Sequence, residues 1–157
     1  MANTYTQFNI HAVFAVKGRE NILSKGIRPR IFEYIHGILK SIGQYPLAVN
    51  GYFDHVHVFF ELNPSISVSS IMQKVKANSA KWINENRFLP GCFSWQEGYG
   101  GFSHSRDQRN RIIQYIMNQE LHHRKKTFRE EYIALLKEFD ILFNHKYLFD
   151  FIVDNNS

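Results

Sequence analysis

The chain has 157 residues, 44% of them hydrophobic, and 19 Lys and Arg against 14 Asp and Glu give a formal charge of +5. This composition excludes disorder as the main state, and the length predicts a single domain over residues 1–157. The excess of basic residues is a weak indication of an anionic partner, and aromatic residues, at 15%, could supply base-stacking surfaces.

The single cysteine, Cys92, excludes an internal disulfide and a cysteine-based zinc cluster. The N-terminal residues lack the basic start and apolar run of a signal peptide. The sequence contains no run of about 18 apolar residues, so it predicts no membrane span. We therefore expect a cytoplasmic protein with no membrane partner.

The first half of the chain alternates between strand and helix signals. Alternating apolar residues predict a strand over residues 5–16. Pro29 opens a helix that ends near Gly43. Residues 46–53 and 55–62 predict two further strands joined as a hairpin.

The second half adds mostly helices. Ser65 or Ser67 could cap a helix that runs to about Asn86. The aromatic, glycine-rich residues 93–105 predict two short strands around a glycine turn. Ser105, with Gln108 as its capping-box partner, predicts a third helix that runs to about His122.

A fourth helix is predicted over residues 128–139, and the aromatic tail, about residues 140–157, is expected to dock on the rest of the domain. The pattern as a whole predicts an α+β fold, in which helices pack on a mostly antiparallel sheet.

Two histidines lie two residues apart in the predicted third strand. Alternation places His55 and His57 on one face, with Cα atoms about 6.6–6.8 Å apart, so both could reach one metal ion. Two half-exposed strand histidines without a ligand would give the same pattern.

Tyr115 and Gln119 are four residues apart on the predicted third helix and share a face. Gln119 could offer its carbonyl oxygen to a hard divalent ion, and Tyr115 could act as a covalent nucleophile. Alternatively, Tyr115 merely flanks the buried isoleucine stripe of this helix.

Basic side chains on the second and third helices could hold DNA phosphates. The candidates are Lys74, Lys76, Arg106, Arg109 and Arg111. Ordinary solvated helix faces would also explain them.

The basic run over residues 122–126 would suit a helix C-terminus whatever the function. His122 as a metal ligand would leave Gln119 redundant. His11, His36 and His145 receive no role.

Three motifs together resemble the single-tyrosine HUH transposases of bacterial insertion sequences, the IS200-like family. The HUH motif, a bulky hydrophobic residue between two histidines, stands at residues 55–57 and follows Asp54. The second motif, Tyr-Ile-Met-Asn-Gln, occupies residues 115–119, and the glycine-rich residues 95–103 lie between the two. The resemblance covers about residues 9–132.

The resemblance implies a ferredoxin-like or RRM-like sheet with packed helices, and a homodimer. It implies Mg²⁺ or Mn²⁺ held by His55, His57 and Gln119. The implied enzyme cleaves and rejoins single-stranded DNA at insertion-sequence ends, recognises hairpins, and forms a 5′-phosphotyrosine on Tyr115. Such a bacterial protein would work at the nucleoid.

Three other functions stay open. One is a domesticated HUH nuclease that processes chromosomal repeat hairpins. Another is a non-catalytic RRM-like module, which needs exposed aromatic side chains on the sheet, where Phe59 is the only aromatic residue on the histidine face of its strand. The last is a small metal-dependent hydrolase with a water nucleophile, in which Tyr115 would be dispensable.

Overall fold

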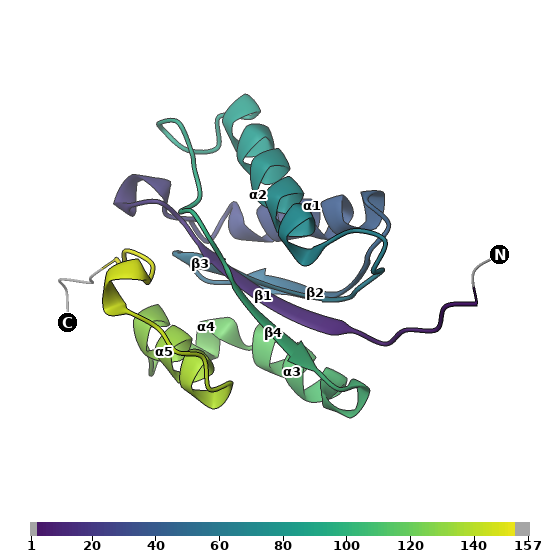
Figure 1. Ribbon diagram of the computed structural model, residues 1–157. Helices are drawn as coiled ribbons and strands as arrows, with labels where there is room; N and C mark the ends of the chain where they lie inside the picture. The colour runs from purple at the N-terminus through teal and green to yellow at the C-terminus, as the bar shows by residue number, and fades with distance from the viewer. Residues whose placement is uncertain (1–2, 153–157) are drawn as a thin grey trace.

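A four-stranded antiparallel sheet forms the centre of the computed structural model, which describes residues 3–152 (Figure 1). The strands are β1 (Asn9–Ala15), β2 (Tyr45–Gly51), β3 (His55–Glu61) and β4 (Gly100–His104), in the order β2-β3-β1-β4. With a helix after β1 and another after β3, this is the ferredoxin-like β-α-β-β-α-β arrangement. The predicted α+β fold and the predicted hairpin of β2 and β3 are therefore confirmed.

Helices α1 (Arg28–Ser41) and α2 (Val68–Glu85) cover one face of the sheet (Figure 1). Pro29 lies in the first turn of α1, as predicted, and the Ser67 hydroxyl caps α2 by accepting a hydrogen bond from the Ser70 backbone. One side of β1 and β3 packs here, as the period-2 pattern indicates: Ala12, Phe14, Val16, Val56, Val58 and Phe60. It is the largest of three hydrophobic clusters among the described residues.

Helices α3 (Arg109–Met117) and α5 (Phe128–Glu138), with the short α4 (Gln119–His122) between them, cover the other face (Figure 1). Both faces of the sheet are therefore buried. The expectation of half-exposed histidines is wrong, because His55 and His57 each have 0% exposure.

The start of the predicted third helix differs from the expectation. It opens with a 3-10 turn, η2 (Arg106–Gln108). The Ser105 hydroxyl donates to the Asp107 carboxylate instead of capping a backbone N–H, so the predicted capping box is wrong. Two further 3-10 turns, η1 (Arg19–Asn21) and η3 (His145–Tyr147), lie in connections.

The predicted third helix is also interrupted. Asn118 leaves helical geometry, with φ −98° and ψ 21°, and separates α3 from α4. Asn50 of β2 donates to the backbone carbonyl oxygens of Ile116 and Met117, at 3.0 and 3.2 Å. A side chain from the sheet thus satisfies the last carbonyl groups of α3 at the break.

The glycine-rich segment forms one strand, not two. Residues before β4 make only an isolated bridge between Trp95 and Val16. A Cβ built on Gly100 would lie 2.7 Å from the hydroxyl oxygen of Tyr132, so this glycine allows α5 to approach β4 closely.

Aromatic side chains after α5 pack against its buried cluster, among them Phe143, Phe149 and Phe151, whereas Tyr147 is 78% exposed. Residues 153–157 of the predicted tail lie outside the described residues. The single-domain assignment stays a prediction. Among the described residues, no helix has both the length and the apolar character needed to span a membrane.

Candidate metal centre and tyrosine site

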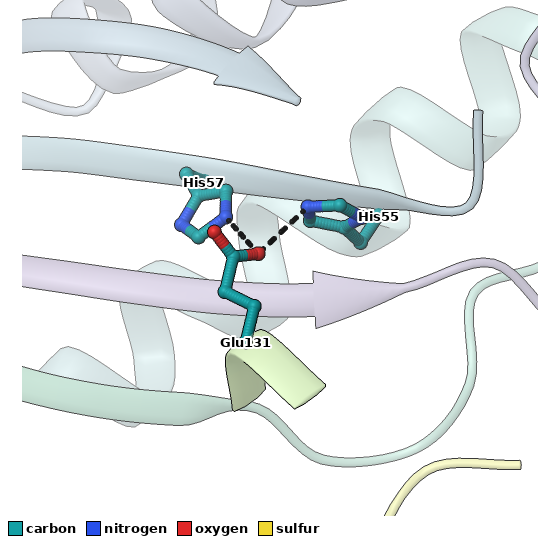
Figure 2. Close-up of side chains that lie close together, drawn as sticks. All are labelled: His55, His57 and Glu131. Atoms are coloured by element: carbon teal, nitrogen blue, oxygen red, sulfur yellow. Dashed lines mark hydrogen bonds and ion pairs between the residues drawn. The ribbon is translucent and has the colours of Figure 1, made fainter. Parts of the chain in front are cut away.

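Two histidines of β3 and a glutamate of α5 point toward one another (Figure 2). Glu131 Oε1 lies 3.1 Å from His57 Nε2 and 3.2 Å from His55 Nε2. The three side chains are fully buried, and their ligand atoms lie within 4.8 Å of one another. Sequence analysis missed Glu131, because it lies on a different helix from the tyrosine motif and 74 residues from His57.

Neighbouring side chains fix the orientation of the two imidazole rings. His55 Nδ1 lies 2.7 Å from Asp54 Oδ1, and the ring stacks on Phe128 with centroids 3.9 Å apart. His57 Nδ1 lies 2.7 Å from His11 Nε2. These contacts leave both Nε2 atoms directed at Glu131, as in sites where an outer partner orients a histidine ligand. Sequence analysis gave no role to His11.

The structure brings Gln119 to the histidine pair. Its Oε1 lies 3.0 Å from His55 Nε2, and its Nε2 donates to Glu131 Oε2 at 2.9 Å. His123 also reaches this point, with Nε2 2.9 Å from Gln119 Oε1 and 3.1 Å from Glu131 Oε1. The sequence marked His123 only as part of a basic run.

Tyr115 lies against the same cluster. Its hydroxyl donates a hydrogen bond to Glu131 Oε2, and its ring centroid is 5.9 Å from that of His57. Burial, with the negative charge of Glu131, raises the pKa of Tyr115 well above its usual value.

The pKa values of the two histidines are shifted in opposite directions. Burial by itself would lower the pKa of His55, but hydrogen bonds to Asp54 and Glu131 outweigh it and raise the pKa to about 9. Burial lowers the pKa of His57, and Glu131 offsets only part of that effect. Burial opposes ionisation of Glu131, but the surrounding histidines hold its pKa far below the usual range.

Imidazole and carboxylate groups that converge in this way can hold a divalent metal ion. The donors fit such an ion chemically, because a carboxylate, an amide oxygen and imidazole nitrogens that have released their protons all offer lone pairs there.

A cavity of about 270 Å³ lies beside Tyr115 and Glu131. Basic and imidazole side chains line part of it: His11, His104, Arg111, His122 and Lys126. Of the five basic residues predicted to contact DNA, Arg111 is therefore the one that lines the cavity at the tyrosine.

The other four predicted DNA contacts are elsewhere. Lys74 and Lys76 belong to α2, on the opposite face of the sheet, and Lys76 Nζ donates to the carbonyl oxygens of residues 96 and 98 at 2.6 and 2.8 Å. Arg109 donates to Asn9 Oδ1 at 2.8 Å and pairs with Glu61. Arg106 is exposed in η2.

Comparison with known proteins identifies the family of this chain. The family described as Transposase IS200-like matches residues 4–119, and the chain belongs to this family. That match ends at Gln119, before His123 and Glu131. No curated protein matches the chain.

Two solved structures share the fold. A protein from Deinococcus radiodurans R1, assigned as a transposase, has a TM-score of 0.60 and 22% identity, over 76% of this chain and 95% of that chain. A REP-associated tyrosine transposase bound to a REP hairpin has a TM-score of 0.57 and 13% identity, over 78% of this chain and 73% of that chain.

Proposed function

We propose that this IS200-like transposase cleaves and rejoins single-stranded DNA at insertion-sequence ends, with Tyr115 as the nucleophile. The observation that carries the proposal is the position of the Tyr115 hydroxyl. It lies within one buried cluster with the HUH histidines and Gln119, and beside a cavity lined by basic side chains.

In the proposed reaction, the phenol oxygen of Tyr115 attacks the scissile phosphorus. A bond forms between this oxygen and phosphorus while the bond from phosphorus to the 3′ oxygen breaks. The phenol proton leaves to solvent, and the 3′ oxygen takes up a proton as a free 3′-OH. The phosphodiester is conserved as a 5′-phosphotyrosine, so a 3′-OH can reverse the step and reseal DNA without ATP.

His55, His57 and Gln119 are the proposed ligands of Mg²⁺ or Mn²⁺, which when bound would polarise the scissile phosphate and offset its developing charge. Glu131 accepts the hydrogen bond of the Tyr115 hydroxyl. A carboxylate with a strongly lowered pKa is a weak base, so we assign Glu131 the positioning of this hydroxyl and not the removal of its proton.

Hairpin recognition is part of the proposal. Its support is the resemblance of the motifs to the HUH transposases and the REP hairpin held by the relative of the same fold. That relative also keeps the second candidate function open, the processing of chromosomal repeat hairpins by a domesticated enzyme. Paired hairpins in the DNA on both sides of the gene would favour the mobile form.

The RRM-like alternative is weakened by burial of the sheet. Phe59, the aromatic residue on the histidine face of β3, has 0% exposure beneath α3, so it offers no stacking surface.

The decisive experiment compares wild type with Tyr115→Phe on labelled hairpin DNA in the presence of Mn²⁺. Wild type is expected to cleave and to form a protein–DNA adduct that survives denaturing gels. Tyr115→Phe should neither cleave nor form the adduct. It should bind the hairpin within a few-fold of wild type, since one neutral hydrogen bond is worth about 0.5–1.5 kcal/mol.

Tyr132→Phe is the matched control, because it removes a hydroxyl from the buried tyrosine next to Glu131 in the chain and should cleave normally. An adduct formed by Tyr115→Phe would identify another nucleophile. Cleavage by wild type without any adduct would favour the hydrolase alternative, with water as nucleophile.

A further inference from the structure

We propose that a basic groove between residues 52–54 and residues 123–130 holds the backbone phosphates of the single-stranded DNA that flanks the scissile phosphate. The cations of the groove are Arg124, Lys125, Lys126 and Arg129. This inference rests on the proposed function, because it names the surface that would hold the substrate strand next to the tyrosine site. None of these four residues is among the DNA contacts that the sequence predicts.

The groove has a volume of about 460 Å³ and lies between two connections of the chain. One wall is the turn between β2 and β3, residues 52–54. The other wall runs from the end of α4 into the first turn of α5, residues 123–130. A concave surface of this kind can contact a strand on more than one side, which an isolated lysine on a helix cannot.

The four cationic side chains of the groove are exposed to solvent. Within residues 3–152, none of them has a carboxylate partner at ion-pair distance, whereas Lys25, Lys81 and Arg109 each pair with a glutamate. The charges of the groove are therefore available to an external anion.

The two carboxylates that line the groove already have partners of their own. Asp54 Oδ1 lies 2.7 Å from His55 Nδ1, and Glu130 Oε1 accepts a hydrogen bond from the Thr127 hydroxyl at 3.1 Å. Four cations against two carboxylates leave the groove with a formal excess of two positive charges.

Helix dipoles do not explain the position of these cations. The helix that precedes them, α4, has only four residues, so its C-terminus carries little of the dipole that attracts cations. Arg129 lies in the first turn of α5, where the dipole disfavours a positive charge. A role at a helix end thus accounts for only part of the basic run, whereas an anionic ligand accounts for all four residues.

Lys126 connects the groove to the tyrosine site. Its side chain lines both the groove and the cavity of about 270 Å³ beside Tyr115. His123 forms part of the groove wall, and its Nε2 lies 2.9 Å from Oε1 of Gln119, a proposed metal ligand. A strand that places its scissile phosphate at the Tyr115 hydroxyl and continues past Lys126 therefore enters the groove.

The class of ligand follows from charge and position. Lysine and arginine side chains bind backbone phosphates and fix the register of a strand without reading its sequence. A groove that begins at the nucleophile would hold the unpaired flank of the substrate, and the paired hairpin stem would lie outside it. Loss of the cations should therefore weaken binding of a flanked hairpin and spare a hairpin without a flank.

The test is fluorescence anisotropy of a labelled DNA hairpin, with or without a flank of unpaired thymidines, in excess chelator to prevent metal-dependent cleavage. Arg124→Gln/Lys125→Gln should bind the flanked hairpin at least about tenfold more weakly than wild type. Its plot of log K against log salt should be shallower by about 1.4, because each single-strand phosphate contact contributes about 0.7 to the slope. On the hairpin without a flank, the two proteins should agree within about twofold.

Lys40→Gln/Lys81→Gln is the matched control, because it removes two exposed lysines from α1 and α2, across the sheet from α4 and α5 (Figure 1). It should bind both hairpins like wild type. Arg129→Gln removes one cation from a different element and should weaken only the flanked complex, by at least about threefold. It decides the question if the double variant of the groove does not fold.

Equal loss in the Lys40→Gln/Lys81→Gln control would show that net charge alone is responsible and would overturn the groove. Equal loss on the hairpin without a flank would do the same, because it would place the contacts on the stem. Flanked-hairpin binding within about twofold of wild type in both groove variants would also overturn it. If wild type then still forms the tyrosine adduct, the proposed function stands while this inference fails. Absence of the adduct, with the expected binding losses, would count against the proposed function and not against the groove.

Discussion

Glu131 is the residue on which the polar cluster depends. A buried carboxylate, here with 2% exposure, destabilises the fold unless it is paired. Four imidazole nitrogens, one amide and one phenol surround Glu131. Removing a partner from such a buried network leaves uncompensated charge. Substitutions at single residues of this site should therefore affect stability as well as chemistry.

His57→Ala should abolish cleavage that depends on divalent ions. It should also lower the free energy of unfolding of the ion-free protein by about 1–3 kcal/mol, because Glu131 and His11 both lose a hydrogen-bond partner. Urea unfolding and a cleavage assay across Mn²⁺ concentrations measure the two effects. His36→Ala, on α1 and remote from the site, should change stability by no more than about 0.5 kcal/mol. Wild-type cleavage that persists in excess chelator would refute the metal role.

At the scale of elements, the position of α5 over the sheet decides whether Glu131 reaches β3. Tyr132, the next residue, packs against β4 at the point where Gly100 lacks a side chain. The glycine therefore sets how closely α5 approaches the sheet. The break at Asn118 has a comparable effect, because it turns Gln119 toward the histidines instead of continuing α3.

Gly100→Ala should push Tyr132 and α5 away from β4. We expect it to destabilise the fold by about 1–3 kcal/mol through overpacking and to weaken Mn²⁺ binding. Gly101→Ala is the control in the same strand, since its Cβ would lie 3.5 Å from the Tyr99 ring, an ordinary contact. Denaturant unfolding and Mn²⁺ titration of both variants test this. Equal stability of the two variants would contradict the role of Gly100.

At the scale of the molecule, the sheet separates two different sides. The α1 and α2 side is an apolar core, and the α3 to α5 side holds the polar cluster and its cavity (Figure 1). The predicted basic contacts are divided between these sides, and the formal charge is only +5. A protein with so few converging cations is poorly suited to gripping long duplex DNA by charge alone.

We expect a strong preference for hairpin DNA with a single-stranded flank over the same sequence in perfect duplex. The scissile strand must enter the site unpaired, and separating base pairs costs a few kcal/mol. Cleavage of the hairpin substrate should therefore be at least tenfold faster in single-turnover assays. Equal rates on linear duplex would contradict the proposed substrate.

The homodimer implied by the family resemblance stays a prediction, and sedimentation at micromolar concentration would test it. Tyr115 contacts Glu131 and approaches His57 of its own chain. Each site should therefore use its own tyrosine. A mixture of Tyr115→Phe and His57→Ala chains should stay inactive, whereas recovered cleavage would show that the tyrosine acts in the partner's site. A stable, fully active monomer would rule out the dimer.

The sequence alone determined most of the elements and two local motifs. Period-2 alternation and helical stripes located β1, β3, α1 and α2, because each pattern needs only neighbours within one element. The two-residue spacing of His55 and His57 places both on one face of a strand. The four-residue spacing of Tyr115 and Gln119 places both on one face of a helix. These four residues do meet in the structure, as the motifs implied.

Only the tertiary structure decided the rest of the cluster. Glu131 lies 74 residues from His57 and His11 lies 46 residues from it, and no spacing rule connects such positions. Burial of the histidines followed from helices packing on the second face, which strand alternation cannot predict. The helix break at Asn118 coincides with a hydrogen bond from Asn50, on a strand remote in sequence. Local pattern determines which residues share a face, and packing between elements determines what that face meets.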